Sequence, residues 1–102
     1  NEGAITVSLP MAFTLAQNAP NPFNPSTTIR FTVAQNAPAK LAIYNTTGQL
    51  VRTLVDGSIE AGAHEIRWDG MDNAGRLVAS GVYIYRLQSS DRVAAKRLTL
   101  VR

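Results

Sequence analysis

The chain has 102 residues, of which 45% are hydrophobic, and it contains no cysteine. This length fits one domain with one modest core, and the apolar fraction is too high for a disordered tail. The lack of cysteine excludes disulfides and thiolate metal sites, and no apolar stretch approaches the roughly 20 residues that span a bilayer.

The formal net charge of +3 is distributed unevenly along the chain. Residues 76–102 contain six Arg or Lys and one acid, whereas residues 1–75 contain four basic residues and six acids. The chain starts at Asn1 and shows no signal-peptide pattern, so we expect a fragment of a longer exported protein. Residues 1–11 are expected to be a linker remnant or a first edge strand, and residues 12–102 the folded domain.

Short runs of alternating apolar and polar residues, separated by Gly, Pro and Asn, indicate β-strands along the whole chain. No segment keeps a stripe of 3.6-residue period, so the predicted class is all-β. Strands are expected at residues 12–17, 27–33, 40–44, 50–55, 64–69, 82–88 and 92–101. This pattern predicts an immunoglobulin-like, fibronectin-III-like two-sheet sandwich of about seven antiparallel strands.

Two β-hairpins and a small set of core residues follow from this pattern. Residues 40–44 and 50–55 are expected to pair across a turn in which Gly48 takes a positive φ. The last two predicted strands, residues 82–88 and 92–101, pair across residues 89–91. The expected core members are Phe31, Ile43, Trp68 and Leu98, with Trp68 at the centre.

Residues 18–26 form a proline-rich segment in which proline fixes φ and disfavours helix in the preceding residue. We therefore expect a stiff, extended crossing. Asn21 and Asn24 are expected to form Asx-turns, and Phe23 to fasten the loop to the core. A proline ligand for an SH3-like partner is the less favoured alternative. The residues of this structural motif are Pro20, Asn21, Pro22, Phe23, Asn24 and Pro25.

Residues 20–31, Pro-Asn-Pro-Phe-Asn-Pro-Ser-Thr-Thr-Ile-Arg-Phe, closely resemble the opening of type A C-terminal sorting domains of the type IX secretion system. Residues 43–51 and the later segments 68–75 and 80–83 resemble further motifs of that family in order and spacing. The pattern is also similar to the immunoglobulin-like domain of the flagellar hook-assembly protein D family. The remaining residues that carry the resemblance are Gly48, Trp68, Gly81 and Tyr83.

The resemblance implies a non-catalytic C-terminal module of a larger exported bacterial protein. Such a module is a sorting signal that secretion machinery at the outer membrane reads as a folded domain, and its expected location is secreted or on the cell surface. The expected partners are that machinery and the upstream domains of the parent protein. The basic terminal hairpin is the expected contact face, through Arg86, Arg92, Lys96, Arg97 and Arg102.

Other binding functions remain open alternatives. A nucleic-acid partner is disfavoured because no stacking aromatic platform or recognition helix accompanies the basic residues. Tyr83 and Tyr85 share one strand face, so a carbohydrate-binding or cell-attachment module that holds polysaccharide is an alternative. In the competing interpretation these are half-buried strand tyrosines, with a tyrosine-corner-like hydrogen bond at Tyr83. A structural spacer is the third possibility.

The sequence offers little for catalysis. His64 is the sole histidine and lies in strand phase with Ile66 and Trp68, so we expect a rim histidine and not a general base. Neither enzyme activity nor a cofactor is expected, and a calcium ion is the one metal considered. Asp69, Asp72 and Asn73 crowd one loop and are candidate calcium ligands, the alternative being an Asx-rich turn.

Overall fold

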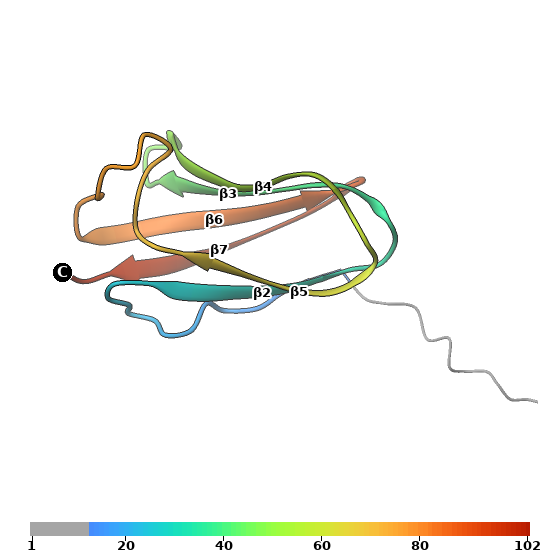
Figure 1. Ribbon diagram of the computed structural model, residues 1–102, viewed down its shortest axis with the longest axis horizontal. Coiled ribbons are helices and arrows are strands. Elements are labelled where there is room, and N and C mark those ends of the chain that lie inside the picture. The colour runs from blue at the N-terminus through green and yellow to red at the C-terminus, as the bar shows by residue number, and fades with distance from the viewer. Residues whose placement is uncertain (1–12) are drawn as a thin grey trace, which may run out of the picture.

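The computed structural model describes residues 13–102, which form seven strands in two sheets (Figure 1). The strands are β1 (Thr14–Leu15), β2 (Thr27–Val33), β3 (Ala37–Asn45), β4 (Leu50–Ile59), β5 (Gly62–Trp68), β6 (Gly81–Ser89) and β7 (Arg92–Leu100). All pairings between these strands are antiparallel, so the predicted all-β sandwich of about seven strands is confirmed. Residues 13–102 contain no helix long and apolar enough to cross a membrane.

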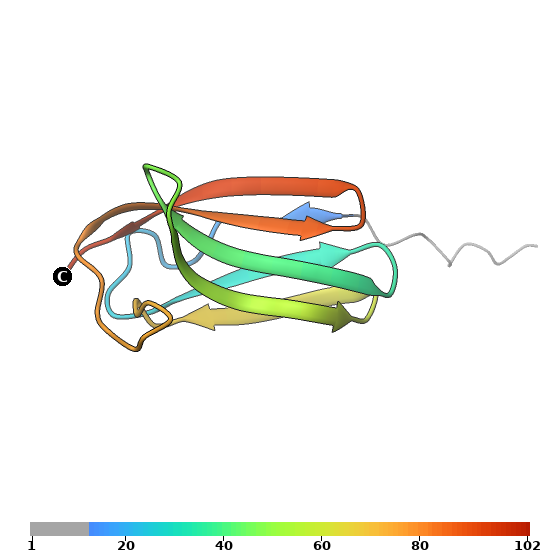
Figure 2. The ribbon, with the colours of Figure 1, turned by 90° about the horizontal axis from the view of Figure 1, so that it is seen from above.

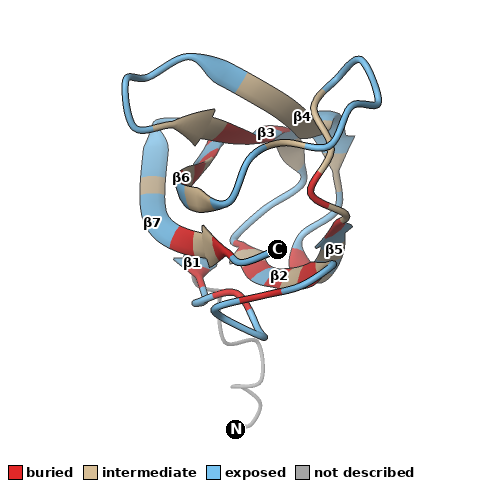
Figure 3. Ribbon diagram, turned by 90° about the vertical axis from the view of Figure 1, so that its left-hand side faces the viewer, coloured by how far each residue is buried: buried red, intermediate tan, exposed pale blue. Residues whose placement is uncertain are grey.

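The strands divide into a three-stranded sheet, sheet A, and a four-stranded sheet, sheet B. Sheet A has the order β1-β2-β5, and sheet B has the order β4-β3-β6-β7. Seen from above, sheet B lies over sheet A (Figure 2). An end-on view shows that the strands of both sheets that surround the space between the sheets contain buried residues (Figure 3).

Period-two alternation decides which side chains enter that space. In β2 the residues Ile29, Phe31 and Val33 are buried, while Arg30 between them is exposed. In β6 the buried positions are Tyr83, Tyr85, Leu87 and Ser89. Residues of adjacent strands that pair directly share a face, so these buried sets identify the inner face of each sheet.

Trp68, at the end of β5, is fully buried in the core. Its ring centroid lies 5.5 Å from that of Phe23 and 5.7 Å from that of Tyr83, and its Nε1 donates a hydrogen bond to Met71 O at 2.9 Å. These contacts join sheet A, sheet B and two loops. The predicted core members Phe31, Ile43, Trp68 and Leu98 are all buried, which confirms that prediction.

The first predicted strand, residues 12–17, is too long. Its described part forms a ladder only at Thr14–Leu15, and residues 1–12 lie outside the described residues. The ladder is interrupted at Gln17 and Asn18, whose polar groups bind other elements. Gln17 Nε2 donates to Arg97 O at 2.7 Å, and Asn18 N donates to the Tyr85 hydroxyl at 2.8 Å.

The predictions for the third and fourth strands are too short. The third strand was predicted over residues 40–44, but β3 runs from Ala37 to Asn45. Pro38 is paired only with β4, because pairing with β6 starts at Ala39, and proline is tolerated where a strand has a neighbour on one side. The fourth strand was predicted to end at Val55, but residues 56–59 continue the ladder of β4 with β3.

The proline-rich segment does not cross from one sheet to the other as an extended strand. It folds back onto β2, since Ala19 and Thr28 exchange two backbone hydrogen bonds of 3.0 Å. The peptide bonds that precede Pro20, Pro22 and Pro25 are cis. Phe23 is 1% exposed and is fastened to β7, because its N–H donates to Thr99 O at 2.9 Å and its carbonyl accepts from Val101 N at 3.0 Å.

Asparagine side chains bind the free edges of both outer strands of sheet B. Asn21 was predicted to form an Asx-turn, but its Oδ1 instead accepts a hydrogen bond from Thr99 N of β7 at 2.9 Å. At the other edge, Asn73 Oδ1 accepts from Thr53 N and Asn73 N donates to Val51 O, both at 3.0 Å. Each asparagine thus makes hydrogen bonds to the edge strand that a neighbouring strand would otherwise make.

We predict that Trp68→Ala lowers the free energy of unfolding by about 3–5 kcal/mol, because it removes a fully buried indole on which Phe23 and Tyr83 pack. The matched control is Leu77→Ala, whose side chain is 61% exposed and whose loss is expected to change stability by less than about 0.5 kcal/mol. Urea unfolding of both variants measures the difference. Similar losses in the two variants would contradict a core centred on Trp68.

Candidate partner-contact surface

The β6–β7 hairpin carries four of the five basic residues that the sequence analysis assigned to partner contact. The ladder pairs Gly81 with Leu100 at one end and Ser89 with Arg92 at the other, and the turn at residues 90–91 places Ser90 at φ 56°. The register between the two strands is regular along the whole ladder. The direction of each side chain is therefore set by its place in the ladder.

The structure does not bring these basic residues to one face. Arg97 pairs with Ile84, and Arg86 pairs with Ala95, on the side of sheet B that faces away from the core. We call this side the outer face of sheet B.

Two of the other basic residues lie on the opposite side of the hairpin. Lys96 pairs with the buried Tyr85, and Arg92 pairs with the buried Ser89, so both lie on the core-facing side. They remain exposed because β7 is the outermost strand of sheet B.

Arg102 is held by the protein itself. Its Nη2 donates to Gly70 O at 2.9 Å, its Nε donates to Val78 O at 2.8 Å, and its backbone N donates to Ser80 Oγ at 2.9 Å. These three bonds fasten the end of the chain to residues 69–81. The side chain is a clamp on this loop and not a free cation.

Tyr83 and Tyr85 are unable to stack on a sugar, because both rings lie in the core and are 8% and 0% exposed. The Tyr83 hydroxyl donates to Ala79 O at 2.6 Å, in agreement with the tyrosine-corner-like interpretation. The Tyr85 hydroxyl donates to Ala16 O at 2.6 Å. Burial raises the pKa of both phenols. The carbohydrate hypothesis based on these two rings is therefore wrong.

The loop that holds the candidate calcium ligands is a small hairpin, with Met71 bridged to Leu77. Asp72 Oδ1 accepts hydrogen bonds from Ala74 N at 2.9 Å and Arg76 N at 3.0 Å. The bond from the Arg76 backbone is the main reason that the pKa of Asp72 lies below its usual range.

The other two candidate ligands also bind protein donors. Asp69 Oδ1 accepts from Met71 N at 3.1 Å and lies 3.4 Å from Arg52 Nη1. Asn73 Oδ1 accepts from Thr53 N at the edge of β4. Residues 13–102 contain no group of three or more His, Cys, Asp or Glu placed to hold a metal ion. Calcium binding stays a prediction. A calcium ion would compete for side-chain oxygens that already accept hydrogen bonds from the protein.

His64 lies at the rim of the core. Its ring stacks on Phe31 with 5.3 Å between centroids and 20° between planes, and its Nε2 lies 2.7 Å from Glu60 O. Gly48 lies between β3 and β4 with the predicted positive φ, +89°, and Gly81 is the first residue of β6.

Asn18, which was not among the predicted site residues, is a buried polar residue that joins the proline-rich segment to sheet B. Asn18 is 3% exposed, and its Nδ2 donates to Pro20 O at 3.1 Å and to Thr27 Oγ1 at 2.9 Å, while its backbone N binds Tyr85. An asparagine before an Ala-Pro pair reads as an ordinary turn residue. Its role depends on Tyr85, 67 residues away in the chain.

The apolar part of the outer face of sheet B was not predicted from the sequence either. A shallow groove there is lined by Tyr44, Asn45, Thr46, Gly48, Ile84 and Arg86. Alternation within each strand was the available signal, because Tyr44 and Ile84 fall out of phase with the core residues of their strands.

Comparison with known proteins places residues 13–92 within the family model described as FlgD Ig-like domain. No curated protein matches the chain in sequence. Among solved structures, the chain is similar to PorU from Porphyromonas gingivalis, a dimeric latent form, with a TM-score of 0.70 and 25% identity over 91% of this chain. It is also similar to PorZ, an essential surface component of the type-IX secretion system of the same bacterium, with a TM-score of 0.58 and 26% identity over 84%.

The chain spans only 10% of PorU and 11% of PorZ. FlgD from Xanthomonas campestris, a protein of flagellar hook capping, matches with a TM-score of 0.60 and 20% identity over 88% of this chain and 66% of its own length, which shows the shared fold. Both resemblances drawn from the motifs are thus confirmed.

We predict that Gly70→Ala destabilises the domain more than Gly75→Ala does. Both glycines have positive φ, +78° and +81°, so each alanine costs about 1–2 kcal/mol in backbone strain. Only at Gly70 would the added Cβ lie 2.9 Å from Arg102 Nη2, so that variant loses about a further 1 kcal/mol by displacing the clamp. Urea unfolding measures both values.

The control for this prediction is the Arg102→Ala background. Once the clamp is absent, Gly70→Ala and Gly75→Ala should cost the same, because only the strain of positive φ remains. An extra loss at Gly70 that persists without Arg102 would contradict the clamp.

We predict that Asp72→Asn weakens the acid sensitivity of the fold. The folded-state pKa of Asp72 is lowered, so its carboxylate stabilises the domain above the unfolded-state pKa, and this contribution is lost as pH falls through the folded-state value. Below about pH 4, the melting temperature of the wild type should therefore fall more steeply than that of Asp72→Asn. Asp72→Ala, which also loses both hydrogen bonds, should melt lower than the wild type at pH 7 as well. Parallel curves for wild type and Asp72→Asn would contradict this account.

Proposed function

Because the chain belongs to the FlgD Ig-like domain family, we propose that it is a non-catalytic module of a larger exported bacterial protein. In this proposal the module is a secretion and cell-surface sorting signal, and type IX secretion machinery reads it as a folded domain. The parent protein supplies the upstream domains, and its destination is the medium or the cell surface.

The observation that supports this proposal most strongly is the likeness to two proteins from the same bacterium. PorZ is described as part of a type-IX secretion system, and PorU shares its fold with this chain over 91% of the chain at 25% identity. In each case the match is a domain-sized part that covers about a tenth of the other protein's chain. The same kind of domain thus occurs within large proteins, one of which belongs to this export route.

Contacts between distant parts of the chain support recognition of the domain in its folded state. Phe23, near the start of the described chain, is bonded to Thr99 and Val101 at the end of β7. Arg102 in turn is bonded to Gly70 and Val78. The terminal segment therefore acquires its conformation only when distant parts of the domain are in place.

We predict that a secreted reporter fused to the N-terminus of the full 102-residue chain reaches the cell surface or the medium in a host with type IX secretion. In an isogenic host with a defective export channel, the same fusion should remain in the periplasm. Cell fractionation with immunodetection of the reporter measures both outcomes.

The folding requirement is tested with the Trp68→Ala fusion, which should remain in the periplasm of the competent host because its core is disrupted. The Leu77→Ala fusion is the matched control and should be exported. Periplasmic retention of a wild-type fusion that is folded, as shown by its resistance to protease, would overturn the sorting function.

A further inference from the structure

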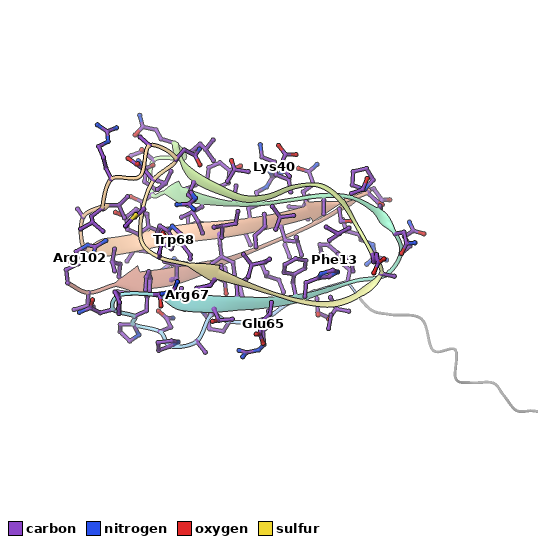
Figure 4. All side chains as sticks on the ribbon, in the orientation of Figure 1. Phe13, Lys40, Glu65, Arg67, Trp68 and Arg102 are labelled. Carbon is purple, nitrogen blue, oxygen red and sulfur yellow. The ribbon has the colours of Figure 1, made fainter. Side chains whose placement is uncertain are left out.

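The outer faces of the two sheets differ strongly in character. The outer face of sheet A bears Thr14, Thr28, Arg30, Thr32, Ala63, Glu65 and Arg67. These side chains are polar or small, and Arg30 Nε forms an ion pair of 2.8 Å with Glu65 Oε2. Figure 4 shows Glu65 projecting from this side and Lys40 from the opposite side of the molecule. Sheet A therefore has the outer face of an ordinary solvated sheet.

The outer face of sheet B has a row of apolar residues that crosses β4, β3 and β6 and ends at Arg97 of β7. Leu50 of β4 pairs with Tyr44 of β3, Tyr44 pairs with Ile84 of β6, and Ile84 pairs with Arg97 of β7. None of these residues belongs to the core cluster or to the residues packed against it.

Exposed apolar side chains are concentrated on the same face. Five large hydrophobic side chains among residues 13–102 are exposed, and three of them, Leu50, Val82 and Val93, belong to this face, with 48%, 41% and 51% exposure. Concentration of apolar surface on one face of a domain is a mark of an interaction site.

Cations without ion-pair partners lie on the same face as this row. Within residues 13–102, Arg86, Arg97 and Lys40 form no ion pair, in contrast to Arg30 on the other sheet. Lys40 pairs in the ladder with Asp56, the one acidic residue on this part of the outer face. The local charge is therefore positive around an apolar centre.

We infer that the outer face of sheet B is the docking surface of this module for an acidic protein surface with an apolar centre. This inference rests on the proposed function and names the partner as a component of the export machinery. Of the basic residues that the sequence placed at the contact, it retains Arg86 and Arg97 and leaves out Arg92, Lys96 and Arg102.

The chemistry of the face favours such a protein over two other occupants. Each copy of this face carries Lys40, Arg86 and Arg97 against one acid, Asp56, so two copies would repel each other by their net positive charge. A polysaccharide is less favoured because the row offers one aromatic ring, and the Asn45 side chain beside it is already bound to Thr47 and Gln49. Aromatic, aliphatic and arginine side chains without water between them are typical of the centre of a protein interface.

The test compares two double variants of the full chain in the reporter fusion described above. Arg86→Glu/Arg97→Glu changes the outer face of sheet B, and Arg92→Glu/Lys96→Glu changes the other side of the same hairpin. Both replace two cations by two glutamates, so the net charge changes equally. We expect export to fall about tenfold or more in the first pair and to stay within about twofold of wild type in the second.

Two further variants separate folding and charge from the loss of docking. The melting temperatures of the purified wild-type and variant chains must be similar. If Arg86→Glu/Arg97→Glu melts lower, Arg86→Gln/Arg97→Gln replaces it, and export is expected to fall in that variant too. Arg86→Lys/Arg97→Lys keeps the positive charge and should retain at least about half of the wild-type export. Loss of export in this conservative pair as well would contradict recognition by charge.

The remaining outcomes distinguish the surface from the sorting function. If the wild-type fusion is exported and Arg86→Glu/Arg97→Glu is exported equally well, the docking surface is wrong and the sorting function stands. If both glutamate pairs lose export equally, net charge and not this face is read, and the inference fails. If the wild-type fusion is not exported, the proposed function fails and the docking surface fails with it.

Measurements on the purified chain test the other occupants. Dimerisation in sedimentation that Arg86→Glu/Arg97→Glu abolishes would assign the face to a second copy. Retention of the chain on insoluble polysaccharide that the same pair abolishes would assign it to a glycan. Either result would overturn the inference of an acidic protein partner.

Discussion

The indole of Trp68 lies where several parts of the chain, far apart in sequence, meet in the core. It belongs to β5 of sheet A, its ring packs against Tyr83 of sheet B, and Phe23 of the proline-rich segment covers it from the side. Its Nε1 also binds the carbonyl of Met71, so that burial leaves no polar atom of the ring unpaired. A domain of this size without disulfides depends on such a centre, because apolar burial is the main term that opposes chain entropy.

Strand phase converts this core into a surface with two different sides. Once Tyr83, Tyr85 and Leu87 are committed to the interior, Ile84 and Arg86 must face outward, and the ladder carries that choice to β7. The basic residues of the last third therefore separate, although they look like one cluster in the sequence. Charge density along a chain is a poor guide to charge density on a face when the chain forms strands.

The fold was predictable from the sequence because alternation and turn residues are local signals. The inner phase of β2 and β6 and the core positions Phe31 and Trp68 follow from them directly. The site was much less predictable. The clamp of Arg102 on Gly70 and the hydrogen bond of Asn18 to Tyr85 join residues that are far apart in the chain, and no local pattern announces them.

The same limit explains the errors in element bounds. Strand ends are decided by which neighbour is present, and the neighbour is not visible in a single stretch of sequence. Pro38 is compatible with a strand because β6 does not yet pair there, and Asn21 binds β7 because that strand passes beside it.

The asparagines at the two borders of sheet B also limit what other molecules can bind at these edges. Backbone groups at Val51, Thr53 and Thr99 are already occupied, so these positions are closed to a strand of another molecule. The domain is thereby protected from edge-to-edge aggregation at these positions.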